Sequence, residues 1–428
     1  MIIPTAAMAQ TPAAPPPAPQ TGTAPAPGIP KEEAAPAPAP VEPPATGAAA
    51  APGVPAPAAP TPPIAPTPEA VPAAGEPAAA EAAPAPAATI AGYVDAGYHL
   101  DFNKNSITNQ PVYRAYDAAG GFQLHAAHLA FSHSFSPEAS AFISLDFGSD
   151  AAINSANYGA NPVDVREGYL KWTPGDFTFQ AGKFVTLNGI EVVDGPLNPT
   201  LTRGFLYWLA EPVGHTGAKV NYAFGGGTAH LGVGVVNGWD QLLDNNNQKT
   251  LLFNGDIVPS ANFHAQISGS WGAEQAADDT HHRLTVDLTG AAVFDALTLN
   301  FQALVGTESF SDAAAGMVDN GHARDTWFGI GIQPVYVMDA FSLGARLEYF
   351  NDAHGSRLNQ PAGVPDKASL LNFTITPGYM VAKNLTLRAE FRIDAALAAK
   401  DPAGNDSKNL FNGKSTQPTV AIGATYTF

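Results

Sequence analysis

The last eleven residues of this 428-residue chain, Pro418–Phe428, constrain its fold more than any other segment. Every second side chain from Val420 to Phe428 is apolar or aromatic, and the residues between them are small or polar. Successive side chains of a strand point to opposite faces, so this period of two predicts a strand with one apolar face and one wet face. A chain that ends on such a strand is typical of a membrane-inserted β-barrel.

The same alternation recurs from Thr89 onward and predicts sixteen strands. Their expected spans are 89–102, 121–135, 140–148, 164–173, 177–186, 215–223, 228–237, 250–258, 262–272, 282–294, 297–306, 325–337, 341–350, 368–380, 385–394 and 416–428. Short joints with turn residues alternate with longer polar joints. The apolar faces carry almost no charge, whereas the outer face of a soluble sandwich would be polar. We therefore expect an all-β fold, a closed antiparallel transmembrane β-barrel over residues 89–428.

The composition changes sharply near residue 88. Residues 1–88 hold 26 of the 40 prolines and none of the aromatic residues. Such a segment has too little apolar area to offset the entropy cost of ordering, so we expect 10–88 to be a disordered Pro/Ala-rich periplasmic segment. Residues 1–9 are interpreted as the remnant of a secretory signal, because Ala7-Met8-Ala9 fits a signal-peptidase site.

Composition also excludes several classes of protein. No window from residue 89 onward holds 18 uninterrupted apolar residues, so a transmembrane helix is not expected. The absence of cysteine rules out a disulfide scaffold and cysteine-based metal or redox chemistry. The formal net charge of −18 argues against nucleic acid as a partner.

The joint 187–214 is the longest and is too apolar for a solvated outer loop. Its apolar residues are Val192, Val193, Leu201, Phe205, Trp208 and Leu209. We expect this joint to fold into the barrel and narrow the lumen, with Glu191, Asp194 and Arg203 at the constriction. A loop packed over the mouth of the barrel, or a contact between subunits, is the alternative.

The opposing wall of the constriction is expected to come from the last strands. The charged residues in question are Arg346, Glu348, Arg388, Glu390 and Arg392. An acidic loop facing a row of arginines would create a transverse field that orients dipolar solutes and filters ions. Alternatively, these charges neutralise one another across neighbouring strands, at about 0.2–1 kcal/mol per pair. The sequence leaves both interpretations open.

Two loops contain residue types that bind metals, but neither has the spacing of a dedicated site. His281-His282 lies beside Asp278 and Asp279, and Asp240 and Asp244 precede Asn245-Asn246-Asn247. The second group lacks the Asp-x-Asp-x-Asp-Gly order of a calcium loop. We expect solvated loops and no metal or other cofactor.

Three histidines, His99, His230 and His264, are expected on the wet faces of their strands. No nucleophile–base pair, phosphate loop or zinc signature is present in the sequence, so the residues do not predict an enzyme.

An ordered set of short motifs resembles the OmpL-like family of β-barrel porins. The matching stretches are Gln180–Phe184, Gly189–Val192, Arg203-Gly204, Pro212, His215–Gly217, Val236–Asp240, Asp244, Asn245 and Lys249. They cover about a third of the predicted barrel. The resemblance implies an outer-membrane channel, and no solute-binding residues can be carried over from it. Tyr426 and Phe428 further resemble the terminal signal that is read by the barrel-assembly machinery.

The sequence therefore predicts an outer-membrane porin that passes small hydrophilic solutes or ions by passive diffusion, with a mild cation preference. The expected partners are outer-membrane lipid, the barrel-assembly machinery and, by analogy with general porins, two further copies in a homotrimer. An alternative is a structural protein whose Pro/Ala segment 10–88 tethers the envelope to peptidoglycan. An outer-membrane lipase or protease is a third and weaker hypothesis.

Overall fold

The computed structural model describes residues 88–103, 121–154, 163–309, 324–358, 367–400, 410–411 and 413–428. The predictions for residues 1–9 and 10–88, including the tether, therefore fall outside the described residues, apart from Ala88. Within the described part the strands are β1 (Thr89–Asp101), β2 (Gly121–Ser134), β3 (Ala139–Phe147), β4 (Val163–Trp172), β5 (Phe177–Val185), β6 (Gly214–Phe224), β7 (Ala229–Val236), β8 (Thr250–Ser260), β9 (Phe263–Ala273), β10 (His282–Phe294), β11 (Leu297–Ser309), β12 (Arg324–Met338), β13 (Phe341–Asp352), β14 (Lys367–Ala382), β15 (Leu385–Lys400) and β16 (Thr416–Thr427).

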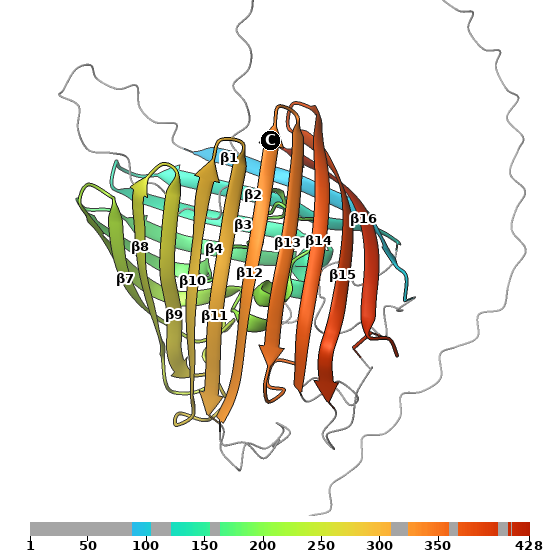
Figure 1. Ribbon diagram of the computed structural model, residues 1–428. Helices are drawn as coiled ribbons and strands as arrows, with labels where there is room; N and C mark the ends of the chain where they lie inside the picture. The colour runs from blue at the N-terminus through green and yellow to red at the C-terminus, as the bar shows by residue number, and fades with distance from the viewer. Residues whose placement is uncertain are drawn as a thin grey trace, which may run out of the picture. The chain divides into compact units, whose positions relative to one another are not determined.

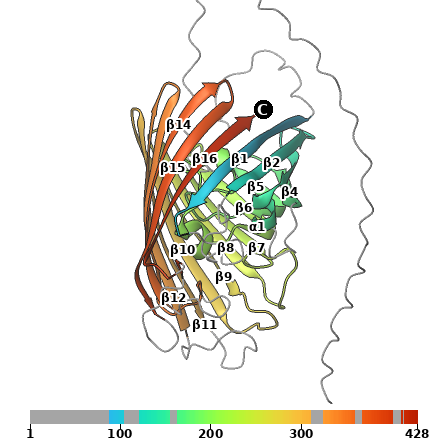
Figure 2. The ribbon, with the colours of Figure 1, turned by 90° about the vertical axis from the view of Figure 1, so that its right-hand side faces the viewer.

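These strands form one closed antiparallel sheet, as Figures 1 and 2 show. Each strand pairs with its neighbour in sequence, and β16 pairs with β1 from Tyr93↔Thr427 to Asp101↔Thr419. At the seam, Gly92 and Phe428 exchange two backbone hydrogen bonds of 3.0 and 2.9 Å. Closure leaves no unpaired sheet edge, which is the condition for crossing a membrane with strands. The predicted fold class is confirmed.

The strand boundaries agree with the predicted spans to within a few residues, and β15 is the main exception. We expected this strand to end at Asp394, but it continues to Lys400. The added residues, Ala395–Ala399, are four alanines and one leucine, so they show no contrast between two faces. Backbone pairing with β14, up to Lys367↔Lys400, extends the strand without such a pattern.

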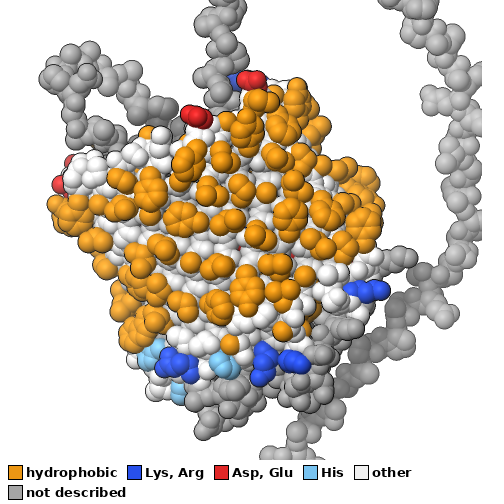
Figure 3. All heavy atoms as spheres, viewed as in Figure 1, with side chains coloured by type: hydrophobic (Ala, Val, Ile, Leu, Met, Phe, Trp, Pro, Cys, Tyr) orange, Lys and Arg blue, Asp and Glu red, His pale blue; other side chains and the backbone are white. Residues whose placement is uncertain are grey.

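The outward face of the sheet is apolar. Exposed side chains include Leu231, Val233, Ile330, Ile332, Leu347, Phe373, Leu387 and Ile422. Figure 3 shows hydrophobic side chains across the middle of the visible face, with Lys, Arg and His along its lower edge. A charged side chain in the middle of such a face would cost about 2–4 kcal/mol in a bilayer, so this distribution fits a surface that contacts lipid.

The short joints are tight turns, as predicted. Asp295, Asp339 and Asn384 have φ values of 50°, 51° and 67°, a left-handed conformation that Asp and Asn tolerate better than most residues. These three turns lie at the same end of the barrel (Figure 1).

The interior contains a short helix, α1 (Ser149–Asn154), and the joint between β5 and β6. In the part of the chain that the structure describes, no helix is both long and apolar enough to span a membrane. The largest buried apolar cluster lies inside the barrel, where residues of the β5–β6 joint pack on inward side chains of β11–β14. Part of the barrel interior is therefore occupied by a packed apolar cluster of its own chain.

Candidate functional site

The joint between β5 and β6, residues 186–213, lies against the wet faces of several strands and is here called the inner segment. Leu187 O accepts hydrogen bonds from Gln266 Nε2 (2.6 Å) and Ser268 Oγ (3.1 Å) on β9. Gly189 N donates to Asp287 Oδ2 on β10 at 2.6 Å. Because inward residues of β9 and β10 face the lumen, these bonds attach the start of the inner segment inside the barrel.

Polar side chains fold the inner segment onto itself. Asn198 Oδ1 accepts from Val192 N at 2.9 Å, and Asn198 Nδ2 donates to Val192 O at 2.7 Å. The Arg203 guanidinium donates to three backbone carbonyls, Val192 O (3.1 Å), Val193 O (2.6 Å) and Leu201 O (3.2 Å). Arg203 therefore organises the segment internally. These bonds satisfy backbone groups that have no sheet partner.

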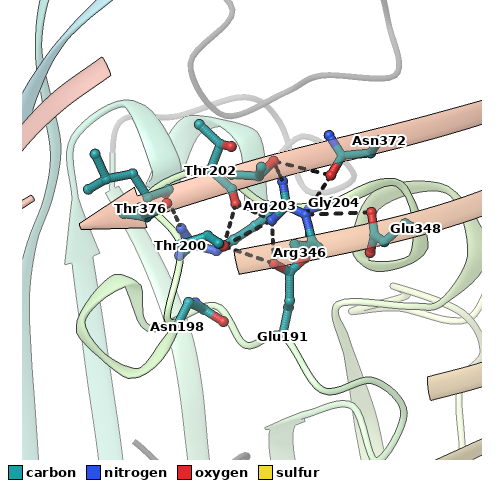
Figure 4. Close-up of polar contacts among 12 residues, drawn as sticks. Glu191, Asn198, Thr200, Thr202, Arg203, Gly204, Arg346, Glu348, Asn372 and Thr376 are labelled. Carbon is teal, nitrogen blue, oxygen red and sulfur yellow. Dashed lines mark hydrogen bonds and ion pairs between the residues drawn. The ribbon is translucent and has the colours of Figure 1, made fainter. Parts of the chain in front are cut away.

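Arg346 on β13 binds the inner segment through several polar contacts, as Figure 4 shows. Its Nη1 donates to Glu191 Oε1 at 2.6 Å, to Thr200 Oγ1 at 2.9 Å and to Thr202 O at 2.6 Å. Its Nε donates to Asn372 Oδ1 on β14 at 3.0 Å. The Arg346 side chain is 0% exposed, so the Glu191–Arg346 ion pair is completely shielded from water. A buried charge pair of this kind is stable only when its other donors and acceptors are also satisfied.

Carboxylates on β13 and β15 accept from the backbone of the same segment. Glu348 Oε2 accepts from Phe205 N at 2.8 Å, and Glu390 Oε2 accepts from Leu201 N at 2.6 Å. The fit is close, because a Cβ at Gly344 on β13 would lie 2.2 Å from Pro199 O. The inner segment therefore rests directly on the β13–β15 wall.

Two arginines of β15 complete this attachment. Arg388 Nη1 donates to Asn198 O at 2.9 Å. Arg392 Nη1 donates to Arg203 O at 2.7 Å, and Arg392 Nε donates to Asp394 Oδ1 at 2.9 Å. These bonds place the arginines of β15 in direct contact with the inner segment. The loop lies on the arginines, because their donors satisfy its backbone carbonyls, and Arg346 and Arg392 are only 0% and 1% exposed.

The opposite side of the inner segment contacts β4 through an ion pair. Asp194 Oδ1 lies 2.9 Å from Arg166 Nη1, and the Asp194 side chain remains 27% exposed. Arg166 Nη2 also donates to His128 Nε2 at 3.1 Å, and Arg166 Nη1 lies 3.5 Å from Asp146 Oδ2. Sequence reasoning identified Asp194 but missed Arg166.

Arg166 lies at a β-bulge. Along β4, Ser144 pairs with Glu167 and Leu145 pairs with Val165, so Arg166 is the extra residue on its strand. The alternation nevertheless holds up to this residue, because Val163 and Val165 are exposed whereas Asp164 and Arg166 are buried. The string Val163-Asp164-Val165-Arg166 was therefore an available signal that Arg166 lies on the wet face.

Apolar packing fixes the second half of the inner segment. A π-helical turn, Leu206–Ala210, packs with Trp327 of β12 and Phe350 of β13. Trp327 Nε1 donates to Ala210 O at 3.2 Å. On the other side, Tyr207 clusters with Ile153 of α1. Burial of each large side chain contributes about 1.5–3 kcal/mol, so this packing adds substantially to the polar attachments.

Asp240 holds the end of the inner segment where β6 begins. Its Oδ1 accepts from Val213 N at 2.7 Å and from Gly214 N at 3.0 Å. Burial raises the pKa of the Asp240 carboxyl to about 6, although the two N–H groups act in the opposite direction. Asp240 therefore has a structural partner on the inner segment, which the calcium-loop hypothesis did not anticipate.

The other candidate metal ligands have local partners. His281 Nδ1 lies 2.6 Å from Asp278 Oδ2, and the pKa of Asp278 is lowered to about 2, chiefly by the backbone N–H of Thr280. Asp244 pairs with Lys249. No cluster of three or more His, Asp or Glu residues that could hold a metal ion occurs in the described ranges.

The three histidines of the wet faces are placed in different surroundings. His99 Nε2 lies 2.7 Å from His125 Nε2, and His230 Nδ1 lies 2.7 Å from Asp256 Oδ2. His264 is 8% exposed. None of the three contacts the inner segment through a hydrogen bond that the structure describes.

A closed sixteen-stranded barrel with a lipid-compatible outer face, a polar inner face and an inner segment defines the porin class of outer-membrane proteins. The family model described as "Putative beta-barrel porin-2, OmpL-like" matches residues 87–428. The chain therefore belongs to this OmpL-like porin family, which places it in the bacterial outer membrane. No curated protein matches the chain.

Solved structures of several outer-membrane proteins have a similar fold. An anion-selective porin from Comamonas acidovorans has a TM-score of 0.54 and 11% identity, covering 80% of this chain and 99% of its own. The trimer form of OmpT from Vibrio cholerae has a TM-score of 0.53 and 11% identity, with coverage of 80% and 99%. The channel DcaP of Acinetobacter baumannii has a TM-score of 0.51 and 15% identity, with coverage of 80% and 97%. At these identities the likeness concerns the fold.

Proposed function

We propose that this protein is a porin through which small hydrophilic solutes or ions diffuse passively, with the inner segment setting the aperture. Family membership and the closed barrel support a channel. Barrels of sixteen strands are wide enough to hold an aqueous passage. The observation that carries the proposal is the attachment of the inner segment to β9, β10, β13 and β15 on their inward faces.

Within this proposal the eight predicted constriction residues have different roles. Seven hold the inner segment in place, namely Glu191, Arg203, Arg346, Glu348, Arg388, Glu390 and Arg392. The eighth residue, Asp194, also lies on the inner segment, and its side chain is 27% exposed. The constriction is therefore narrowed by a fixed segment, and its local charge is set mainly at the edge near Asp194.

The remaining expectations belong to the same proposal. The net charge of −18 favours a mild preference for cations. Residues 10–88 would lie in the periplasm, Tyr426 and Phe428 would be read by the barrel-assembly machinery, and the protein would form a homotrimer. The trimer form reported for the OmpT structure supports the last point by analogy of fold. The family and the fold support a channel and provide no support for an enzyme.

Conductance in planar bilayers tests the proposal directly. Purified protein, refolded in detergent, should produce discrete conductance steps with a reversal potential that indicates weak cation preference. Deletion of residues 196–201 from the inner segment should increase the single-channel conductance, because the aperture would widen. A folded barrel that gives no ion flow at all would refute the proposed function. An unchanged conductance in the deletion variant would refute the role of the inner segment.

A further inference from the structure

The inner segment is attached to two walls of very different character. On the β13–β15 wall, buried arginines and carboxylates bind the backbone of the segment. On the β2–β4 wall, the polar attachment that the structure describes is the Asp194–Arg166 ion pair at 2.9 Å. The exposed fraction of Asp194, 27%, means that water reaches this pair, whereas Arg346 is 0% exposed.

Arg166 is itself held by a chain of contacts on its own wall. Arginine can only donate, so His128 Nε2 accepts from Arg166 Nη2 at 3.1 Å. The proton of a neutral His128 is then on Nδ1, which donates to Asp146 Oδ1 at 2.6 Å. The Tyr93 ring stacks on His128 with centroids 4.8 Å apart. These contacts hold the guanidinium through groups that lie outside the inner segment.

The charges of this group do not cancel. Arg166 carries one positive charge, and it lies between the carboxylates of Asp194 and Asp146, at 2.9 and 3.5 Å. A neutral His128 adds nothing, so the group has one excess negative charge. Arg166 therefore compensates part of the charge of Asp194, and loss of its positive charge leaves an uncompensated carboxylate at the edge of the segment.

We propose that Arg166, which our sequence interpretation did not include, is a positioning residue for ion selectivity. It holds Asp194 at the edge of the aperture and compensates its charge, so that this pair, rather than the buried arginines of β13 and β15, governs the ion preference. The inference rests on the proposed channel function and extends it to a second wall. The relevant ligands are small inorganic ions.

Reversal potentials in a potassium chloride gradient test this role, with full-length protein in planar bilayers. Arg166→Met should increase the cation-to-anion permeability ratio by about fivefold, the effect of one uncompensated charge at contact distance in water. Asp194→Asn should shift the ratio in the opposite direction. Arg166→Lys should restore the wild-type ratio, and the Arg166→Met/Asp194→Asn double variant should lie close to it.

Lys171→Met is the matched control, because it removes a cation from the same strand, five residues from Arg166. If Lys171→Met shifts the ratio as much as Arg166→Met does, the effect comes from the overall lumen charge and the inference is wrong. An unchanged ratio in Arg166→Met would also overturn it. A wild-type protein without conductance would instead contradict the proposed channel.

A second measurement does not need conductance. The chain has no cysteine, so Leu197→Cys introduces a unique thiol on the inner segment, at a position that is 48% exposed. Arg166→Met should increase the rate at which a small maleimide labels this thiol, because the attachment to β4 is lost, and Arg166→Lys should not. An equal labelling rate in all three backgrounds would show that Arg166 does not position this part of the segment.

Discussion

The two walls that hold the inner segment differ in how far their charges are shielded from water, and the difference explains what each can do. On β13, Arg346 and Glu348 are covered by the segment and are 0% and 3% exposed. On β4, Arg166 pairs with Asp194, whose side chain is 27% exposed. The β13–β15 wall provides anchorage, and the β2–β4 wall provides a charge that water reaches.

Breaking the attachment of the inner segment to the β13–β15 wall should cause the largest loss of stability. Arg346→Met would leave the Glu191 carboxylate buried without its ion-pair partner, at a cost of about 3–5 kcal/mol. Urea unfolding of the barrel in detergent micelles would measure this loss. The Glu191→Gln/Arg346→Met double variant should recover part of the stability, because the unpaired charge is then absent. If Arg346→Met loses much less stability than this, the Glu191–Arg346 pair is not a main attachment of the inner segment.

The attachment at Asp240 should give an intermediate and pH-dependent effect. Its pKa is raised in the folded protein to about 6 from an ordinary value of 3.8, so the folded state binds the proton more tightly than the unfolded state does. Stability should therefore fall as the pH rises from about 4 through about 6. When unfolding midpoints are measured across this pH range, their slope against pH should be smaller for Asp240→Asn than for the wild-type protein. An identical slope in the two proteins would mean that a group other than Asp240 titrates.

The Asp194–Arg166 ion pair on the β2–β4 wall should contribute least to stability. Asp194→Asn removes a partly exposed ion pair, which is worth about 0–1 kcal/mol. The same urea experiment should therefore separate it clearly from Arg346→Met, even though both variants remove one charged contact of the inner segment. A loss from Asp194→Asn as large as that from Arg346→Met would mean that the two walls are equivalent anchors.

The sequence predicted the barrel well because its physical signal is local. Alternation along each strand records which side chains meet lipid and which meet water, as for Leu387 and Phe391 against Arg388 and Glu390. The apolar character of residues 187–214 likewise indicated burial. Where the local contrast vanished, at Ala395–Ala399, the prediction ended the strand too early.

The site was less predictable because its contacts join residues that are distant in sequence. Glu191 and Arg346 were both candidates, but their direct pairing across 155 positions was not foreseen. The sequence left open whether the loop faces the arginines or these charges neutralise one another, since only packing reveals that the loop covers the arginines. Arg166 was missed although the alternation Val163-Asp164-Val165-Arg166 places it on the wet face, because no local pattern shows that it meets Asp194.

By itself, the sequence determined which face of each strand is apolar and, from the alternation of short and long joints, that the sheet closes into a membrane barrel. These properties follow from the two-residue period of a strand and from the cost of unpaired backbone groups in lipid. Only the tertiary structure decided which charges meet inside the barrel. Ion pairing depends on distances of a few ångströms between segments whose relative placement is set by bulges, burial and closure.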